Sequence, residues 1–129
     1  MLLLKKNNLD KKKALNEMLN GSGVFIIKNF YSLNQINQAR DIINKLADTQ
    51  EQKESHFNAE AEAKGKIHLQ QRVWNLFNKG KIFSDLITDD IIFDLMSDFL
   101  GTQFICGSYA ASRLLPGAAG QEPHIDYPY

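Results

Sequence analysis

The feature that most constrains this chain is its final stretch, residues 104–129, which joins an extended run to a short motif of ligand-type side chains. Residues 103–115 predict a long strand, and residues 124–128 predict another. Small and hydroxylic residues gather at positions 107–112. They leave room beside a sheet either for a ligand or for a closely packed helix, and the sequence leaves both possibilities open.

The motif is His124-Ile125-Asp126. Side chains alternate faces along a strand, so His124 and Asp126 would share one face, with their Cα atoms roughly 6.5–7 Å apart. An imidazole nitrogen and a carboxylate oxygen at that spacing can both reach one metal ion, at about 2.0–2.2 Å each. These donors suit a divalent iron that keeps positions open, although a solvated His and Asp on a loop would give the same three letters.

Composition places few limits on the rest. The chain has 129 residues, which predicts a single domain over 1–129, and 15 basic residues balance 15 acidic ones. That balance favours neither nucleic acid nor an anionic membrane as a partner. The opening apolar run is too short for a signal peptide or a membrane span. The single cysteine, Cys106, excludes an intrachain disulfide and suggests a cytoplasmic protein, and its apolar neighbours predict a buried structural thiol.

The amino-terminal part predicts a helix after a frayed terminus. Residues 1–8 carry no periodic pattern and are expected to be frayed. Over residues 10–19 the apolar side chains follow the spacing of one helix face. Asp10 is a suitable N-cap for that helix, and Asn20-Gly21 is a suitable stop.

A strand and a second helix are expected next. Residues 24–28 form a continuous apolar, β-branched run, which predicts a buried strand. Ser32 then begins a helix, and Gln35 stands three residues later, as in a capping box. The apolar stripe of this helix predicts an end near residues 49–53.

Residues 50–66 are polar and predict either a mobile loop or a solvated helix; the loop is the expectation adopted for this segment. His56 and His68 flank it. Neither has a partner at a metal-ligand spacing, so neither is predicted to bind metal.

Regular structure is expected again over residues 67–77, which contain the only tryptophan. Trp74 is either a core anchor or a wall of a cleft, where Arg72 could reach an anionic substrate. A short helix is predicted over 82–87, and a longer one from a Thr88 cap to Leu100. Together these elements predict an α+β fold in which helices at the amino-terminal side pack on a few strands.

In this order the elements resemble the first half of a phytanoyl-CoA dioxygenase family protein. The resemblance covers the chain from about residue 10 and rests on four stretches. They are Gly23-Val24-Phe25-Ile26-Ile27-Lys28-Asn29-Phe30 with the Ser32 helix, Arg72-Val73-Trp74-Asn75-Leu76 with Lys79-Gly80, Phe99-Leu100-Gly101 with the strand after it, and Pro116-Gly117 with Gln121 and His124-Ile125-Asp126-Tyr127-Pro128-Tyr129.

The resemblance implies an iron(II)- and 2-oxoglutarate-dependent dioxygenase that hydroxylates a small organic molecule. It implies a double-stranded β-helix, or jelly-roll, of which this chain holds a truncated part. His124 and Asp126 would be iron ligands, Gln121, Ser112 and Tyr127 would lie near 2-oxoglutarate, and Arg72 and Trp74 would lie toward the substrate.

The family pattern continues past the His-x-Asp motif to a second histidine and an arginine that binds 2-oxoglutarate. Arg113 precedes the motif and does not match that arginine. We therefore expect an incomplete, poorly active fragment, which could associate with itself through an open sheet edge. Two other readings stay open: a binding module that kept the scaffold without the chemistry, and a cupin-like metal-binding jelly-roll.

Overall fold

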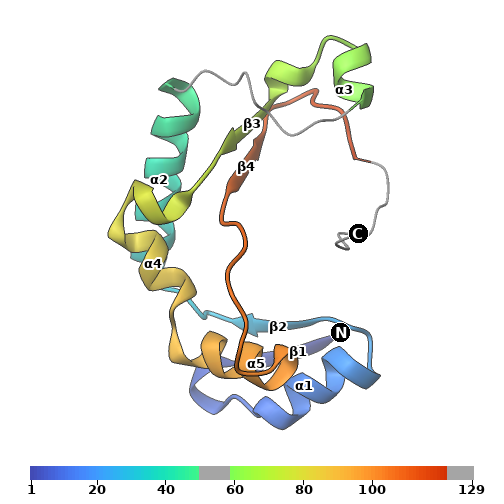
Figure 1. Ribbon diagram of the computed structural model, residues 1–129, viewed down its shortest axis with the longest axis vertical. Helices are drawn as coiled ribbons and strands as arrows, with labels where there is room; N and C mark the ends of the chain where they lie inside the picture. The colour runs from blue at the N-terminus through green and yellow to red at the C-terminus, as the bar shows by residue number, and fades with distance from the viewer. Residues whose placement is uncertain (50–58, 122–129) are drawn as a thin grey trace.

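The computed structural model describes residues 1–49 and 59–121, which form a mixed helix and strand structure. The elements gather into two groups, and residues 102–110 run in an extended path from one group to the other (Figure 1). Each group contains one two-stranded sheet. The described residues thus agree with the predicted mixture of helices and strands, and a jelly-roll is not present among them.

The amino-terminal group is a strand–helix–strand unit with a late helix added to it. Strand β1 (Leu2–Lys5) leads through the 3-10 turn η1 (Lys6–Asn8) into α1 (Lys11–Asn20) and then β2 (Phe25–Lys28). The two strands pair in parallel, and α5 (Asp90–Leu100) packs beside α1. The expectation of a frayed start over residues 1–8 is therefore wrong, because β2 provides a partner strand for Leu2–Lys5.

The core of this group lies on one face of the β1–β2 sheet. Leu4, Ala14 and Leu95 are buried there, and partly buried side chains of both strands and of α5 surround them. Side chains of β2 alternate, so Ile26 points away from this core and is 42% exposed. Phe25–Lys28 thus form the strand that was expected over 24–28, one residue shorter, but the strand is half-exposed and not buried on both faces.

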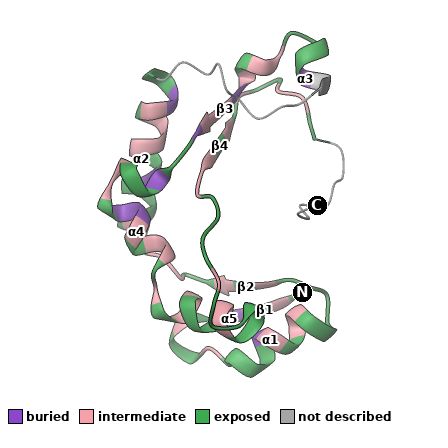
Figure 2. Ribbon diagram, in the orientation of Figure 1, coloured by how far each residue is buried: buried purple, intermediate pink, exposed green. Residues whose placement is uncertain are grey.

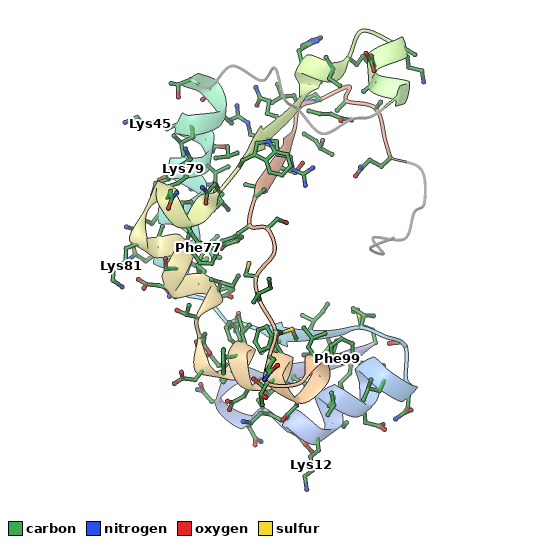
Figure 3. All side chains as sticks on the ribbon, viewed as in Figure 1. Lys12, Lys45, Phe77, Lys79, Lys81 and Phe99 are labelled. Carbon is green, nitrogen blue, oxygen red and sulfur yellow. The ribbon has the colours of Figure 1, made fainter. Side chains whose placement is uncertain are left out.

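Two helix caps were predicted in this group, Asp10 and Thr88, and only Asp10 acts as one. The Asp10 carboxylate accepts a hydrogen bond from the Lys13 N–H at 3.0 Å and begins α1, and Lys12 projects outward from that helix (Figure 3). Helix α5 is capped by Asp89, whose carboxylate accepts from the Ile91 N–H at 3.0 Å. Thr88 is not the cap, because its N–H and its hydroxyl both donate to the Ser84 carbonyl and end α4.

The second group carries the larger core (Figure 2). It contains α2 (Leu33–Thr49), β3 (Gln70–Val73), the 3-10 turn η3 (Leu76–Lys79), α4 (Lys81–Ile87) and β4 (Ala111–Leu114). Its buried residues are Ala39, Ala47, Val73, Leu76, Ile82 and Phe83. As predicted, Ser32 and Gln35 form a reciprocal capping box: the Gln35 N–H donates to the Ser32 hydroxyl at 3.2 Å, and the Ser32 N–H to the Gln35 side chain at 2.9 Å.

The predicted strand over 103–115 is shorter than expected. Only Ala111–Leu114 pairs, because β3 has four residues and offers no further partner. Cys106 lies in the unpaired part and is exposed, so the prediction of a buried thiol is wrong. A methyl group placed on Gly107 would contact nothing within 4 Å, so no helix is packed closely on this glycine in the described part of the chain.

The region predicted as a loop over 50–66 contains a short helix, α3 (Ala59–Ala63), and Ala61 within it is buried. A 3-10 turn, η2 (Ile67–Leu69), links it to β3. Residues 50–58 of that segment lie outside the described residues. Among the helices that the structure describes, none is long and apolar enough to cross a membrane.

Candidate functional site

The candidate site is built on the antiparallel pair β3–β4. The strands are in register with Gln70 opposite Leu114, Gln71 opposite Arg113, Arg72 opposite Ser112 and Val73 opposite Ala111. Residues directly opposite each other on an antiparallel pair point to the same face, and successive residues point to opposite faces. The register therefore sorts these eight residues into two faces of four.

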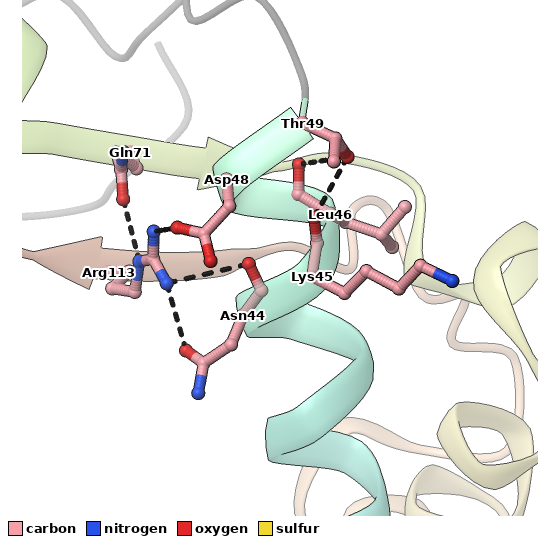
Figure 4. Close-up of polar contacts among 7 residues, drawn as sticks. All are labelled: Asn44, Lys45, Leu46, Asp48, Thr49, Gln71 and Arg113. Carbon is pink, nitrogen blue, oxygen red and sulfur yellow. Dashed lines mark hydrogen bonds and ion pairs between the residues drawn. The ribbon is translucent and has the colours of Figure 1, made fainter.

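One face lies against α2. Val73 is buried in the core there, and Ala111 packs at its edge. The Arg113 guanidinium completes the contact: its Nε donates to the Gln71 side chain at 2.6 Å, and its Nη1 donates to the Asn44 side chain at 3.1 Å. Its Nη2 forms an ion pair with Asp48 (Figure 4). Arg113 thus links the sheet to α2, and its positive charge has a structural role in that contact.

The opposite face carries polar and aromatic groups. Arg72 and Ser112 are paired across it, and the Arg72 guanidinium lies over the Trp74 ring at 4.6 Å from the ring centre. Trp74 is 42% exposed and Ser112 is exposed. Trp74 is therefore not a core anchor. Stacking on an indole face fixes the plane of a guanidinium.

After β4 the chain turns back along β3. The Leu115 N–H donates to the Leu69 carbonyl at 2.9 Å, and the Ala118 N–H donates to the Leu115 carbonyl at 3.0 Å. Gly117 has a φ of 85° at the third position of this turn, directly after Pro116. That is the pattern of a type II turn, in which the third position requires positive φ and so favours glycine.

The returning segment is held by a buried side chain. Gln70 is buried on β3, and its Nε2 donates to the Ala119 carbonyl at 3.0 Å. Residues 115–119 are thereby attached to both Leu69 and Gln70. The structure brings the part of the chain that leads toward the His-x-Asp motif close to the face that carries Arg72 and Ser112.

The structure locates four of the predicted site residues. Arg72, Trp74 and Ser112 come together on the open face of β3–β4, and Gln121 is exposed after the turn. His124, Asp126 and Tyr127 lie outside the described residues, as does the strand predicted over 124–128. Within residues 1–49 and 59–121, there is no group of three or more side chains of the types that hold a metal ion.

The four strand residues of this face include one charged side chain, Arg72. Arg72 carries a fixed positive charge, and Ser112 is its partner residue on the neighbouring strand. Tyr109 does not belong to this face: it packs against the core cluster that contains Val73, and burial raises the pKa of its phenol. The Tyr109 ring packs edge-on against Phe77, with the ring centres 5.3 Å apart.

Sequence reasoning missed two parts of this arrangement, the Gln70 contact and the Arg113 network. Neither has a sequence signal, because both depend on which residues the β3–β4 register places opposite each other.

The chain was also compared with known proteins. No protein-family model, no curated protein and no solved structure matches it.

Proposed function

We propose that this chain is the front part of an iron(II)- and 2-oxoglutarate-dependent dioxygenase of the phytanoyl-CoA dioxygenase type, acting on a small organic molecule. The observation that carries the proposal is the sequence His124-Ile125-Asp126, which begins five residues after a chain segment anchored on β3. An imidazole and a carboxylate are the donor types that divalent iron accepts while keeping positions open for other ligands.

The two donor types of the motif fit iron. The family pattern requires one further histidine, which does not occur after Asp126 in this sequence. When bound, iron would activate O₂ with 2-oxoglutarate as the reductant. The chain's own share is to place the two donors and to orient the small molecules beside them.

The described residues support the proposal through their placement. In the proposal, Ser112 and Gln121 lie near 2-oxoglutarate together with Tyr127, and Arg72 with Trp74 receives the substrate. In the proposal, the positive charge of Arg72 would suit a substrate with a carboxylate or phosphate group. In the proposal, the two-stranded β3–β4 sheet would be part of a double-stranded β-helix.

The first experiment titrates the ¹⁵N-labelled chain with Fe(II) without oxygen and follows paramagnetic broadening of backbone amide signals, which detects weak binding. Signals of residues around His124 and Asp126 should broaden first, and 2-oxoglutarate should then add a weak visible charge-transfer band. His124→Ala and Asp126→Ala should each abolish the local broadening.

His68→Ala is the matched control, because His68 is an exposed histidine on η2. It should leave the broadening around residues 124–126 unchanged. If the two ligand variants broaden as the unmodified chain does, the ligand assignment is wrong. If no local broadening occurs at all, the reading of the chain as a non-catalytic binding module replaces the proposal.

A further inference from the structure

The stretch between the two groups of elements is an extended segment that pairs with no strand in the described part of the chain. Residues 102–110 run directly into β4 (Figure 1). Strand β3 ends at Val73, and Asn75, with a φ of 55°, turns the chain away into η3. The N–H and carbonyl groups of residues 103–108 make no backbone hydrogen bond with the described residues.

The middle of this segment is open to solvent. The Ile105 side chain is 89% exposed, and residues 106–108 are exposed as well. A methyl group placed on Gly107 would contact nothing within 4 Å. An exposed run of unpaired N–H and carbonyl groups is a template to which another strand can add.

Both ends of the segment are held in place. At one end the Phe104 ring packs against Phe93 of α5, with the ring centres 5.4 Å apart. At the other end Tyr109 packs against the core of the second group, and its carbonyl accepts from the Leu76 N–H at 2.9 Å. A strand held at both ends loses less conformational entropy on pairing than a free one. The region open to pairing is thus confined to residues 104–108.

The composition of the segment favours an identical partner. No charged residue lies between Asp98 and Arg113, so two copies meet no like-charge repulsion along the pairing. A charged peptide finds no opposite charge there. An antiparallel pair of identical strands has a twofold axis, which closes the assembly at two copies.

The limits of the open region set the register. With the twofold axis at Cys106, the midpoint of the region, each Phe104 lies opposite Ser108 of the second copy and each Ile105 lies opposite Gly107. Each large side chain then faces a small one, and the open space beside Gly107 receives Ile105. The two Cys106 side chains face each other directly, with their Cβ atoms about 4.5–5.5 Å apart.

We propose that residues 104–108 are a homodimer interface, at which two copies of this chain pair as antiparallel strands about Cys106. This interface does not depend on the function proposed above, since none of its residues has a part in the iron or 2-oxoglutarate site. The paired stretch is short, and a two-stranded ribbon is marginally stable in water, so the dimer dissociates in the micromolar to millimolar range.

The first test is sedimentation velocity of the unmodified chain and of two variants, at concentrations up to about 1 mM. The chain should form a dimer and no larger species. Ile105→Lys places charges of the same sign close together across the axis and should raise the dissociation constant about 10-fold or more. Leu33→Lys is the matched control, because Leu33 is 81% exposed on α2. It should leave the constant within about 2-fold.

The second test locates the axis by disulfide formation with diamide, which oxidises two thiols and takes up their two hydrogens. At a concentration where the dimer forms, Cys106 should cross-link to its counterpart about 10-fold faster than a cysteine outside the interface. The control is Lys12→Cys in a Cys106→Ser background, since Lys12 projects outward from α1 (Figure 3).

Four results would overturn the proposal. Two concern the unmodified chain: a monomer at every concentration, or growth beyond a dimer. The third is equal weakening of the dimer by Ile105→Lys and Leu33→Lys. The fourth is an equal rate of cross-linking at positions 12 and 106, which would place the contact between copies elsewhere on the chain.

Discussion

Asp89 links the 3-10 turn η1, through Lys6, to the start of α5, and its replacement should change the stability of the chain in a pH-dependent way. Its carboxylate accepts from the Ile91 N–H at 3.0 Å and pairs with the Lys6 ammonium at 2.6 Å. The same ammonium lies 4.3 Å from the centre of the Phe30 ring. The Lys6 hydrogen bond, with help from Ile91, holds the pKa of Asp89 below its ordinary value, against the opposing effect of burial.

The two interactions set the expected magnitude. An N-cap contributes about 1 kcal/mol, and an ion pair that is partly exposed contributes about 0–1 kcal/mol. Asp89→Ala should therefore lower the free energy of unfolding by about 1–2 kcal/mol at pH 7, and lower Tm by roughly 4–10 °C. Asp89→Asn keeps a good cap and loses the charge, so it should cost no more than about 1 kcal/mol.

The pH dependence follows from the lowered pKa. Stability from such a carboxylate is present above the pKa of the unfolded chain, about 3.8, and is lost as pH falls through the lower folded value. The gap between the unmodified chain and Asp89→Asn should therefore be full at pH 6–7. It should shrink below about pH 4 and close as Asp89 becomes protonated.

Urea unfolding followed by circular dichroism from pH 7 down to pH 3 measures this gap. Asp94→Asn is the control, since the Asp94–Lys11 pair is more exposed and makes no cap. It should change stability by no more than a few tenths of a kcal/mol. A cost of Asp89→Ala below about 0.3 kcal/mol, or a gap to Asp89→Asn that widens on acidification, would refute the reasoning.

Three further predictions concern packing, exposure and association. Phe83 is 1% exposed, so Phe83→Ala should lower the free energy of unfolding in urea by about 3–5 kcal/mol. Phe93 is 57% exposed, so Phe93→Ala should lower it by less than about 1 kcal/mol. Equal losses in the two variants would contradict the assigned core. Cys106 should react with a thiol reagent in the folded chain within about 5-fold of its rate in urea, and a requirement for unfolding would show that it is buried. Because the described sheets have two strands each, light scattering should detect association that grows with concentration, and a monomer at high concentration would count against an open edge.

Elements with a local signal were predictable from sequence. The Ser32 and Gln35 side chains specify the start of α2 by bonding to each other's backbone, and Gly101 ends α5 with a φ of 88°. These interactions span a few residues, so the sequence contains all the information that they need. The Asp10 cap of α1 is of the same kind.

Elements that depend on distant partners were not predictable. Leu2–Lys5 has too few residues for a periodic pattern and becomes a strand because Phe25–Lys28 pairs with it. Residues 104–110 have the composition of a strand and remain unpaired because β3 is short. In the candidate site, Arg72 and Trp74 were singled out by residue type, but the pairing of Arg72 with Ser112 is a consequence of register.

The apolar interior is divided into two clusters, and this division affects the order in which parts of the chain unfold. The buried members of the amino-terminal cluster are Leu4, Ala14 and Leu95, whereas the other cluster contains Phe83 and Val73, which are almost fully enclosed. Opening the smaller cluster exposes less apolar surface and so requires less free energy. A state in which β1, α1, β2 and α5 have come loose while β3 and β4 remain paired against α2 is therefore the first intermediate to expect, and it would still hold Arg72, Ser112 and the Pro116-Gly117 turn in place.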